Sequence, residues 1–174
     1  VFQLHHLLPQ CTILENVRAL PRAFTVTRAA GVEEGPEALA AALWDTGKGE
    51  LLWDERFAVE DADGRRDESL AVLPGGDAPP AAAPVEEVSP HRTVVRPDAP
   101  TPSLLVLADT YYPGWEARVD GVEATIYPVN GMFRGVFLPA GPHLVEFDYR
   151  PASFRVGAWA AVAALALCLA GWLA

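Results

Sequence analysis

Hydrophobic and polar residues alternate along much of residues 103–151, between short sequences that are typical of tight turns. Asp120-Gly121 and Asn130-Gly131 tolerate the positive φ angles of two-residue hairpins, and Pro139-Ala140-Gly141 predicts a third turn. After the third turn, apolar residues alternate with acidic ones, as in a strand that buries one face. Arg134 interrupts the alternation in its own strand. The pattern predicts an antiparallel β meander of five short strands.

Shorter stretches before residue 103 also have the composition of strands. They are residues 11–15, 23–27, 50–53, 57–59 and 91–96. One helix is predicted over Pro36–Trp44, because proline suits the first turn and Glu37 favours the positive end of the helix dipole. We expect a solvated loop over the charged residues 60–69. We expect an extended or mobile linker over 74–84, which is rich in Pro, Ala and Gly.

The predicted elements are mainly β, with one short helix inserted early. Strands that each bury one face are stable when two sheets pack against each other. We therefore predict an antiparallel β-sandwich for residues 1–155. The sequence does not fix the strand order, so a jelly-roll and an immunoglobulin-like arrangement both remain open.

Residues 156–174 carry no charged side chain. A helix of this length rises about 28 Å, close to the roughly 30 Å hydrocarbon thickness of a bilayer. Trp159 and Trp172 lie near its two ends, and Arg150 and Arg155 precede it, so all four are predicted membrane-interface residues. The alternative for the two arginines is contact with a lipid-linked phosphate at the membrane surface. We predict a transmembrane helix, with a buried Ala-rich helix of a larger soluble protein as the alternative.

The remaining residues carry the whole formal charge of −10. This acidity argues against binding nucleic acid through a basic face. The two cysteines, Cys11 and Cys168, are far apart in sequence, and a disulfide between them is not expected. The four histidines lack the spacing of metal ligands, so we predict no metal site and no cofactor. Because the chain begins without Met and stops inside the apolar run, we expect it to be part of a longer protein.

Aromatic residues gather after the first strand of the predicted meander. Tyr111, Tyr112 and Trp115 can stack on sugar faces, and Asp109 can accept hydrogen bonds from sugar hydroxyls, so these four residues are a candidate carbohydrate site. The alternative is that the aromatic rings close one end of the sandwich. The other acidic residues fall at a turn or on solvent-facing positions, and no serine lies in a nucleophile-elbow motif, so we predict no catalytic residue.

Three motifs carry a resemblance to a known family. LLVLADTYYPGW (104–115), VDG (119–121) and NGMFRGVFLPAGPHLVEFDYRP (130–151) resemble the C-terminal extracytoplasmic domain of YfhO-type bacterial membrane proteins. Asn16 and the segment ALPRAF (19–24) match a second signature of the family further upstream. Those proteins are similar to multi-spanning glycosyltransferases that use lipid-linked sugars. Their catalytic carboxylate lies on loops between early membrane helices, and none of that region is in these residues.

The resemblance implies a function for the chain. It would be a non-catalytic accessory domain in cell-envelope polymer glycosylation, such as that of teichoic acid, which positions an acceptor or stabilises the membrane part. The implied partners are the bilayer, the upstream transmembrane region and a cell-envelope glycopolymer, with residues 1–155 outside the cytoplasm. Arg150 and Arg155 alone would favour the cytoplasmic side for this end of the helix, and we follow the resemblance. The alternative function is a structural or protein-interaction module without carbohydrate affinity.

Overall fold

The computed structural model describes most of the chain. It covers residues 2–8, 11–16, 19–33, 35–45, 50–51, 57–60, 66–76 and 78–173. Within these ranges the side chains are described except at 2–8, 11–16, 44–45, 50–51, 167, 170, 172 and 173. The side chains of Cys11 and Trp172, and parts of the strand predicted over 50–53 and of the loop predicted over 60–69, therefore lie outside the described residues.

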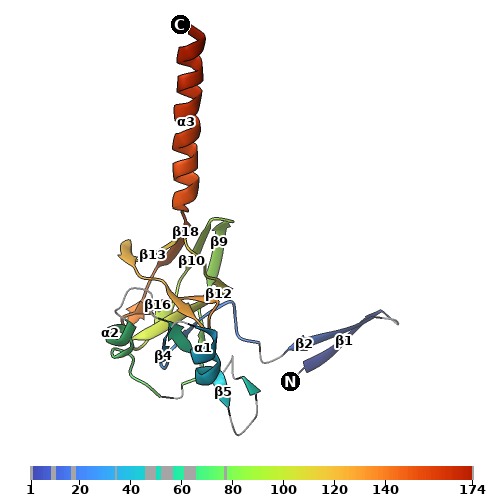
Figure 1. Cartoon of the computed structure of the whole chain (residues 1–174). Helices are drawn as coiled ribbons and strands as arrows, with labels where there is room; N and C mark the ends of the chain where they lie inside the picture. The colour runs from blue at the N-terminus through green and yellow to red at the C-terminus, as the bar shows by residue number, and fades with distance from the viewer. Residues whose placement is uncertain are drawn as a thin grey trace.

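Two larger sheets form the body of the protein (Figure 1). The seven-stranded sheet has the order β4 (Ala30–Val32), β7 (Ala58–Glu60), β15 (Tyr127–Val129), β16 (Phe133–Leu138), β12 (Ser103–Thr110), β3 (Ala23–Val26) and β8 (Ala81–Ala82). The five-stranded sheet has the order β14 (Val122–Ala124), β13 (Trp115–Val119), β18 (Val145–Tyr149), β10 (Arg92–Val95) and β9 (Val85–Ser89). Neighbouring strands are antiparallel, except that β4 and β7 are parallel. The prediction of a mainly β, antiparallel fold is confirmed.

Three two-stranded sheets complete the β structure of the described residues. They pair β1 (Phe2–Leu8) with β2 (Cys11–Asn16), β5 (Trp44–Asp45) with β6 (Glu50–Leu51), and β11 (Asp98–Ala99) with β17 (Gly141–Pro142). The β1–β2 hairpin projects away from the two larger sheets (Figure 1). Strand β2 confirms the strand predicted over residues 11–15, whereas β1, β5 and the edge strand β9 were not predicted.

The two predicted hairpin turns are confirmed. Asp120 and Gly121 have φ angles of 51° and 83° and join β13 to β14. Asn130 and Gly131 have φ angles of 51° and 73° and join β15 to β16. Asn and Asp tolerate this left-handed conformation better than other residues with a side chain, so these dipeptides close their hairpins without severe strain.

The prediction of one continuous meander is wrong. Strand β12 pairs with β16 and β3, whereas the next strand along the chain, β13, pairs with β18 and β14 in the other sheet. The chain crosses between the sheets after β12, after β14 and after β16. Hairpin turns are local signals, but the sheet that a hairpin joins depends on its pairing with strands far away in sequence.

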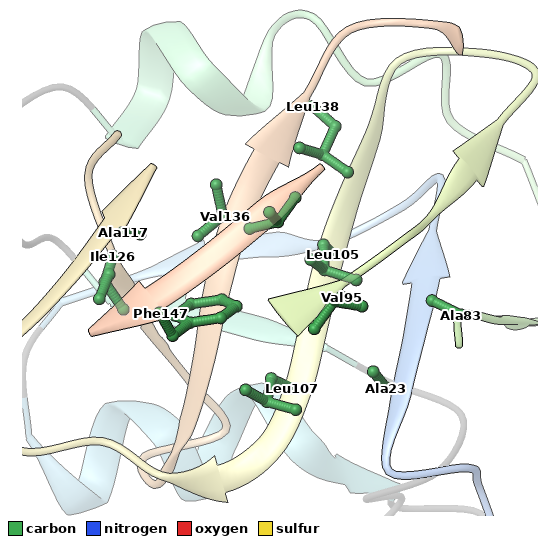
Figure 2. Packing of buried hydrophobic residues seen from close by; sticks show 11 residues of the cluster. Ala23, Ala83, Val95, Leu105, Leu107, Ala117, Ile126, Val136, Leu138 and Phe147 are labelled. Atoms are coloured by element: carbon green, nitrogen blue, oxygen red, sulfur yellow. The ribbon is translucent and has the colours of Figure 1, made fainter. Parts of the chain in front are cut away.

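The main hydrophobic core lies between the two sheets (Figure 2). Leu105 and Leu107 of β12 and Val136 of β16 come from the seven-stranded sheet, and Val145 and Phe147 of β18 come from the five-stranded sheet. All five side chains are at most 1% exposed. Because one cluster joins the inner faces of both sheets, the architecture is a sandwich. The outer face of the five-stranded sheet is polar, with Arg92 of β10 paired to Glu146 and Asp148 of β18.

The seven-stranded sheet is also covered on its second face. Leu104 and Val106 of β12 point there, together with buried residues of β3, β7 and β15. The partly buried Leu70 and Leu73 pack against this cluster. Leu70 ends helix α2 (Arg66–Leu70), which lies where the sequence predicted a loop. The prediction is wrong there because the apolar Leu70 and Leu73 give this short charged segment a face to bury.

The prediction of an extended linker over residues 74–84 is partly wrong. Strand β8 pairs with β3, and Ala83 is 7% exposed within the main core. Small alanine side chains let this low-complexity segment lie close against the edge of the sheet. The predicted helix is confirmed as α1 (Pro36–Leu43), with Leu43 fully buried.

The helix predicted at the end of the chain is α3 (Ala152–Leu173), which extends away from the sheets (Figure 1). Its side chains are described without interruption from residue 152 to 166, a rise of about 22 Å against about 30 Å of hydrocarbon. Among the described residues, no helix is both long enough and apolar enough to span a membrane. The transmembrane span predicted for residues 156–174 is therefore not supported by the described part of the chain.

Candidate functional site

The candidate carbohydrate residues lie where the chain crosses from β12 to β13. Asp109 belongs to the end of β12, Trp115 begins β13, and the turn between them holds Tyr111 and Tyr112. Trp115 pairs with Tyr149, the last residue of β18, so the turn lies beside the start of α3. The structure brings together all four residues that the sequence singled out.

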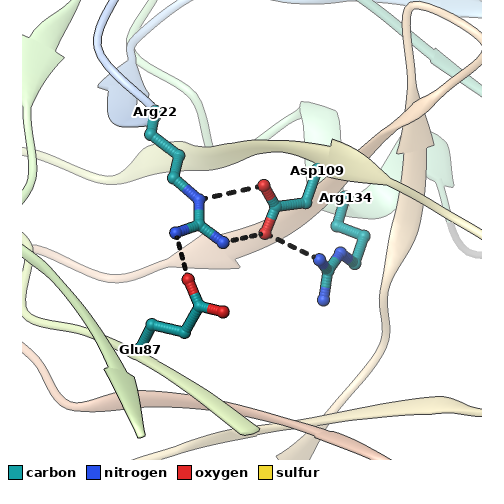
Figure 3. A network of polar contacts seen from close by, with 4 residues as sticks. All are labelled: Arg22, Glu87, Asp109 and Arg134. Carbon is teal, nitrogen blue, oxygen red and sulfur yellow. Dashed lines mark hydrogen bonds and ion pairs between the residues drawn. The ribbon is translucent and has the colours of Figure 1, made fainter. Parts of the chain in front are cut away.

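A charged network surrounds Asp109 (Figure 3). Arg22 donates from Nε to Oδ1 at 3.0 Å and from Nη2 to Oδ2 at 2.9 Å, a bidentate contact. Arg134 donates from Nη2 to the same Oδ2 at 2.9 Å. Arg22 also donates from Nη1 to Glu87 Oε2 at 2.9 Å. The carboxylates raise the pKa of Arg22, the hydrogen bond to Asp109 most strongly. Asp109 is thus engaged by two guanidinium groups.

Arg134 is buried, with only 3% of its side chain exposed. Its guanidinium carbon lies 3.8 Å from the centre of the Trp115 ring and 5.4 Å from the centre of the Phe147 ring. Burial lowers the pKa of Arg134, and the charge of Asp109 opposes this effect. Among the described residues, Nε and Nη1 of Arg134 and Nε1 of Trp115 are buried and without a hydrogen-bond partner. Asp109 is therefore the acceptor that compensates this buried charge in the described structure.

The aromatic rings form a second part of the site. The Tyr149 ring lies 5.2 Å from Tyr112 and 5.3 Å from Trp115, and Tyr112 is 6.3 Å from Trp115 in an edge-on arrangement. His91 reaches the Tyr149 ring at 6.3 Å. These separations are in the range in which aromatic pairs attract each other. The rings therefore support one another at this end of the sandwich.

Exposure differs among the candidate residues. Tyr111 and Trp115 are half-buried and pack against the main core, whereas Tyr112 is 44% exposed. Arg134 covers one face of the Trp115 ring, so this face is not open for stacking on a sugar. The carbohydrate site remains a prediction, with Tyr112 as its most accessible ring.

The turn is held against the entry to α3. The Gly114 carbonyl accepts a hydrogen bond from the Arg150 N–H at 2.7 Å. Gly114 has a φ angle of 108°, and a Cβ added there would lie 2.9 Å from Tyr149 Cε2 and 3.1 Å from Pro151 Cα. Only glycine allows this backbone conformation and this close approach.

The predicted membrane-interface residues lie at the same junction. Arg150 is exposed, with Glu116 Oε2 at 3.8 Å and Asp148 Oδ2 at 3.7 Å. Arg155 and Trp159 are exposed residues of α3, Trp159 at 73%. Residue Trp172 belongs to α3, but its side chain lies outside the described residues. In the described part of the chain, no group of three or more His, Cys, Asp or Glu side chains is arranged to hold a metal ion.

Sequence reasoning missed several partners in the site, namely Arg22, Glu87, Arg134 and Tyr149. Arg134 could have been found from the sequence, because it interrupts the alternation of its strand, and an arginine at an inward position of a strand needs a partner for its charge. Arg22 lies 87 residues from Asp109 in sequence, and no periodicity links them.

Comparison with known proteins shows a similarity to one family over part of the chain. Residues 87–160 match the model of the family described as Bacterial membrane protein YfhO. Over this stretch, the chain is similar to that family. The resemblance predicted from the motifs at residues 104–151 is thereby confirmed. The second signature, at Asn16 and residues 19–24, lies outside the matched stretch and stays a prediction. No curated protein and no solved structure matched the chain.

The matched stretch begins within β9 and ends within α3. It contains Asp109, Tyr112, Trp115 and Arg134. Arg22 lies outside it, on the segment that leads into β3. The charged network therefore connects the matched stretch to an earlier part of the chain.

Proposed function

We propose that residues 1–155 form a non-catalytic, extracytoplasmic accessory domain of a YfhO-type membrane protein, and that α3 attaches this domain to the bilayer. The observation that carries the proposal is the junction of β18 with α3. Strand β18 is the central strand of the five-stranded sheet, and only Arg150 and Pro151 separate it from the helix. A rigid sheet thus continues almost directly into an apolar helix.

The exposed apolar side chains of α3 support the proposal that this helix lies in lipid. Every described side chain from residue 152 onward is exposed, including Phe154 at 74%, Val162 at 58% and Leu165 at 62%. Soluble proteins rarely expose a continuous apolar surface of this kind. The apolar residues surround the helix instead of forming one stripe, which favours lipid over a single protein partner. The family description as a membrane protein agrees with this role.

The proposed role of the domain is structural, not catalytic. Asp109 accepts hydrogen bonds from Arg22 and Arg134, which holds it as a structural carboxylate. Asp120 is likewise engaged, by the Leu144 N–H and by His143. The domain would stabilise the membrane part of the protein in cell-envelope polymer glycosylation. The extracytoplasmic side rests on the family resemblance, and labelling of Val122→Cys in intact bacteria by a membrane-impermeant maleimide tests it: protection until lysis would contradict it.

Flotation with phosphatidylcholine vesicles tests the attachment. The unchanged chain should float, and the double variant Val162→Glu/Leu165→Glu should remain in the dense fraction. A charged residue at the centre of a membrane helix costs about 3 kcal/mol, so two should reduce partitioning more than a thousandfold. Val122→Glu is the matched control, because Val122 is 71% exposed on β14. Flotation of the double variant together with the control would refute attachment through α3.

Carbohydrate positioning is a second candidate role, favoured by the exposed Tyr112 beside Trp115. Titration of the chain with teichoic-acid fragments, followed by tryptophan fluorescence, tests it. Saturable quenching that is lost in both Tyr112→Ala and Trp115→Phe would support this role. If the folded chain does not respond to any fragment, the domain has the structural role alone.

A further inference from the structure

Two turns of the β domain also carry exposed apolar side chains. Tyr112 is 44% exposed in the turn between β12 and β13, and Met132 is 49% exposed in the turn between β15 and β16. The two turns meet, because the Tyr111 N–H donates to the Met132 carbonyl at 2.7 Å. Two exposed apolar side chains therefore lie on turns that a backbone hydrogen bond joins.

The Tyr111–Gly114 turn has a fixed position relative to the helix. The hydrogen bond from Arg150 to Gly114, the close approach of Gly114 to Pro151 and the ring contact between Tyr112 and Tyr149 all connect the turn to the residues that precede α3. These contacts leave little room for the sandwich to tilt on a flexible linker. The position of α3 in the membrane therefore also determines the position of the Tyr111–Gly114 turn.

The height of the turn follows from the helix geometry. The charge-free part of α3 begins at Val156, five residues after Pro151, a rise of about 7.5 Å. The polar layer on each side of the hydrocarbon is roughly 5–8 Å thick. If Val156 marks the edge of the hydrocarbon, Pro151 and the adjoining turn fall within or at the outer edge of the headgroup layer.

The chemistry of the junction suits this layer. A tyrosine ring offers an apolar body and a polar hydroxyl, and aromatic residues of this kind are enriched where membrane meets water. Arg150 and Arg155 supply cationic groups close to the lipid phosphates. Because Arg150 is also near Glu116 and Asp148, the junction has little net positive charge and does not require anionic lipid.

We propose that the Tyr111–Gly114 turn is a membrane-contact surface that rests in the headgroup layer of a phospholipid bilayer. This inference relies on the proposed attachment through α3. Tyr112 would then lie at the lipid interface. The sandwich would contact the membrane with the end that carries the Tyr111–Gly114 turn.

The test places an environment-sensitive fluorophore at single cysteines in the full chain, with Cys11 and Cys168 replaced by serine. The labelled variants are Pro113→Cys in the turn, Val122→Cys as control and Leu165→Cys in α3. Val122 lies on the row of Val145, which is four residues, or about 13 Å along the strand, from Tyr149 at the helix end of β18. Circular dichroism and Trp emission verify that each variant is folded.

Each chain is reconstituted in phosphatidylcholine vesicles that contain lipid with a nitroxide on the headgroup or on the acyl chain. The label at 113 should shift to the blue and lose fluorescence with headgroup nitroxide, whereas the label at 122 should stay unquenched. The label at 165 should be quenched by acyl-chain nitroxide. If 165 is quenched but 113 behaves like 122, the turn does not contact the membrane, although the attachment stands. If 165 is not quenched, both the attachment and the contact surface are wrong.

Discussion

Replacing Asp109 tests the buried charge of Arg134 most directly. In Asp109→Asn, Arg134 keeps its charge but loses the carboxylate 2.9 Å away. Among the described residues, no other acceptor is bonded to the buried Nε and Nη1 of Arg134, so nothing replaces the lost carboxylate. Removing one partner of a buried ion pair costs about 3–5 kcal/mol. Asp109 is 21% exposed, so we expect the lower end, about 3 kcal/mol.

The assay is urea unfolding of the full chain in a nonionic detergent, followed by Trp fluorescence. With a slope of about 2 kcal/mol per molar urea, a loss of 3 kcal/mol lowers the midpoint by about 1.5 M. Arg22→Ala is the first control. Its side chain is 44% exposed, and removing an exposed ion pair should cost only about 0.2–1 kcal/mol and less in high salt.

A second variant separates charge from packing. Asp109→Asn/Arg134→Met removes both charges and keeps a long side chain against Trp115. Because a buried ion pair can often be replaced by apolar residues at little cost, we expect the double variant to be more stable than Asp109→Asn alone. If Asp109→Asn costs no more than Arg22→Ala, or if Arg134→Met fails to restore stability, burial of an uncompensated charge is not what Asp109 prevents.

Two further predictions concern the turns and the packing. Two hydrogen bonds lower the pKa of Asp120 below its usual 3.8, the one from the Leu144 N–H most strongly and the one from His143 next. The ionised Asp120 carboxylate therefore stabilises the folded chain above about pH 3.8, and this stabilisation is lost as the pH falls through the lowered pKa. Thermal unfolding of Asp120→Asn across this range should show lower stability than the unchanged chain at neutral pH and a difference that vanishes in acid; a constant difference would contradict the linkage. Gly135→Ala places a Cβ 2.4 Å from Val129 Cγ2 and 3.1 Å from Leu104 Cδ1, and should cost about 1–3 kcal/mol in urea unfolding. Gly157→Ala, whose Cβ meets nothing within 4 Å, should not destabilise the chain, and equal losses in both variants would show that crowding at Gly135 is not the cause.

Features set by neighbouring residues could be predicted from the sequence. The Asp120-Gly121 and Asn130-Gly131 hairpins depend on the conformational freedom of two residues, and helix α1 depends on the signals at its first turn. The alternation in β18 also holds, because Val145 and Phe147 are fully buried and Glu146 and Asp148 pair with Arg92 on the outer face.

Features set by distant pairing could not be predicted. The two hairpins lie in different sheets because β13 pairs with β18 and β15–β16 pairs with β12. Nothing in the residues of either hairpin specifies these partners. In the candidate site, the aromatic turn was found because its members are adjacent in sequence. The charged network was missed because Arg22, Asp109 and Arg134 meet only after both sheets have formed.

The position of β3 shows that the stretch matched by the family model is not the whole of the folded sheet. The stretch that carries the family signature starts at residue 87, yet β12, its most buried strand, needs β3 (Ala23–Val26) as its neighbour on one side. A shortened gene product that began near residue 87 would keep the signature and open a long apolar strand to other chains, which invites edge-to-edge aggregation. The stretch that matches the family model is thus shorter than the part of the chain that covers β12, and any insertion, fusion or truncation should keep β3 beside β12.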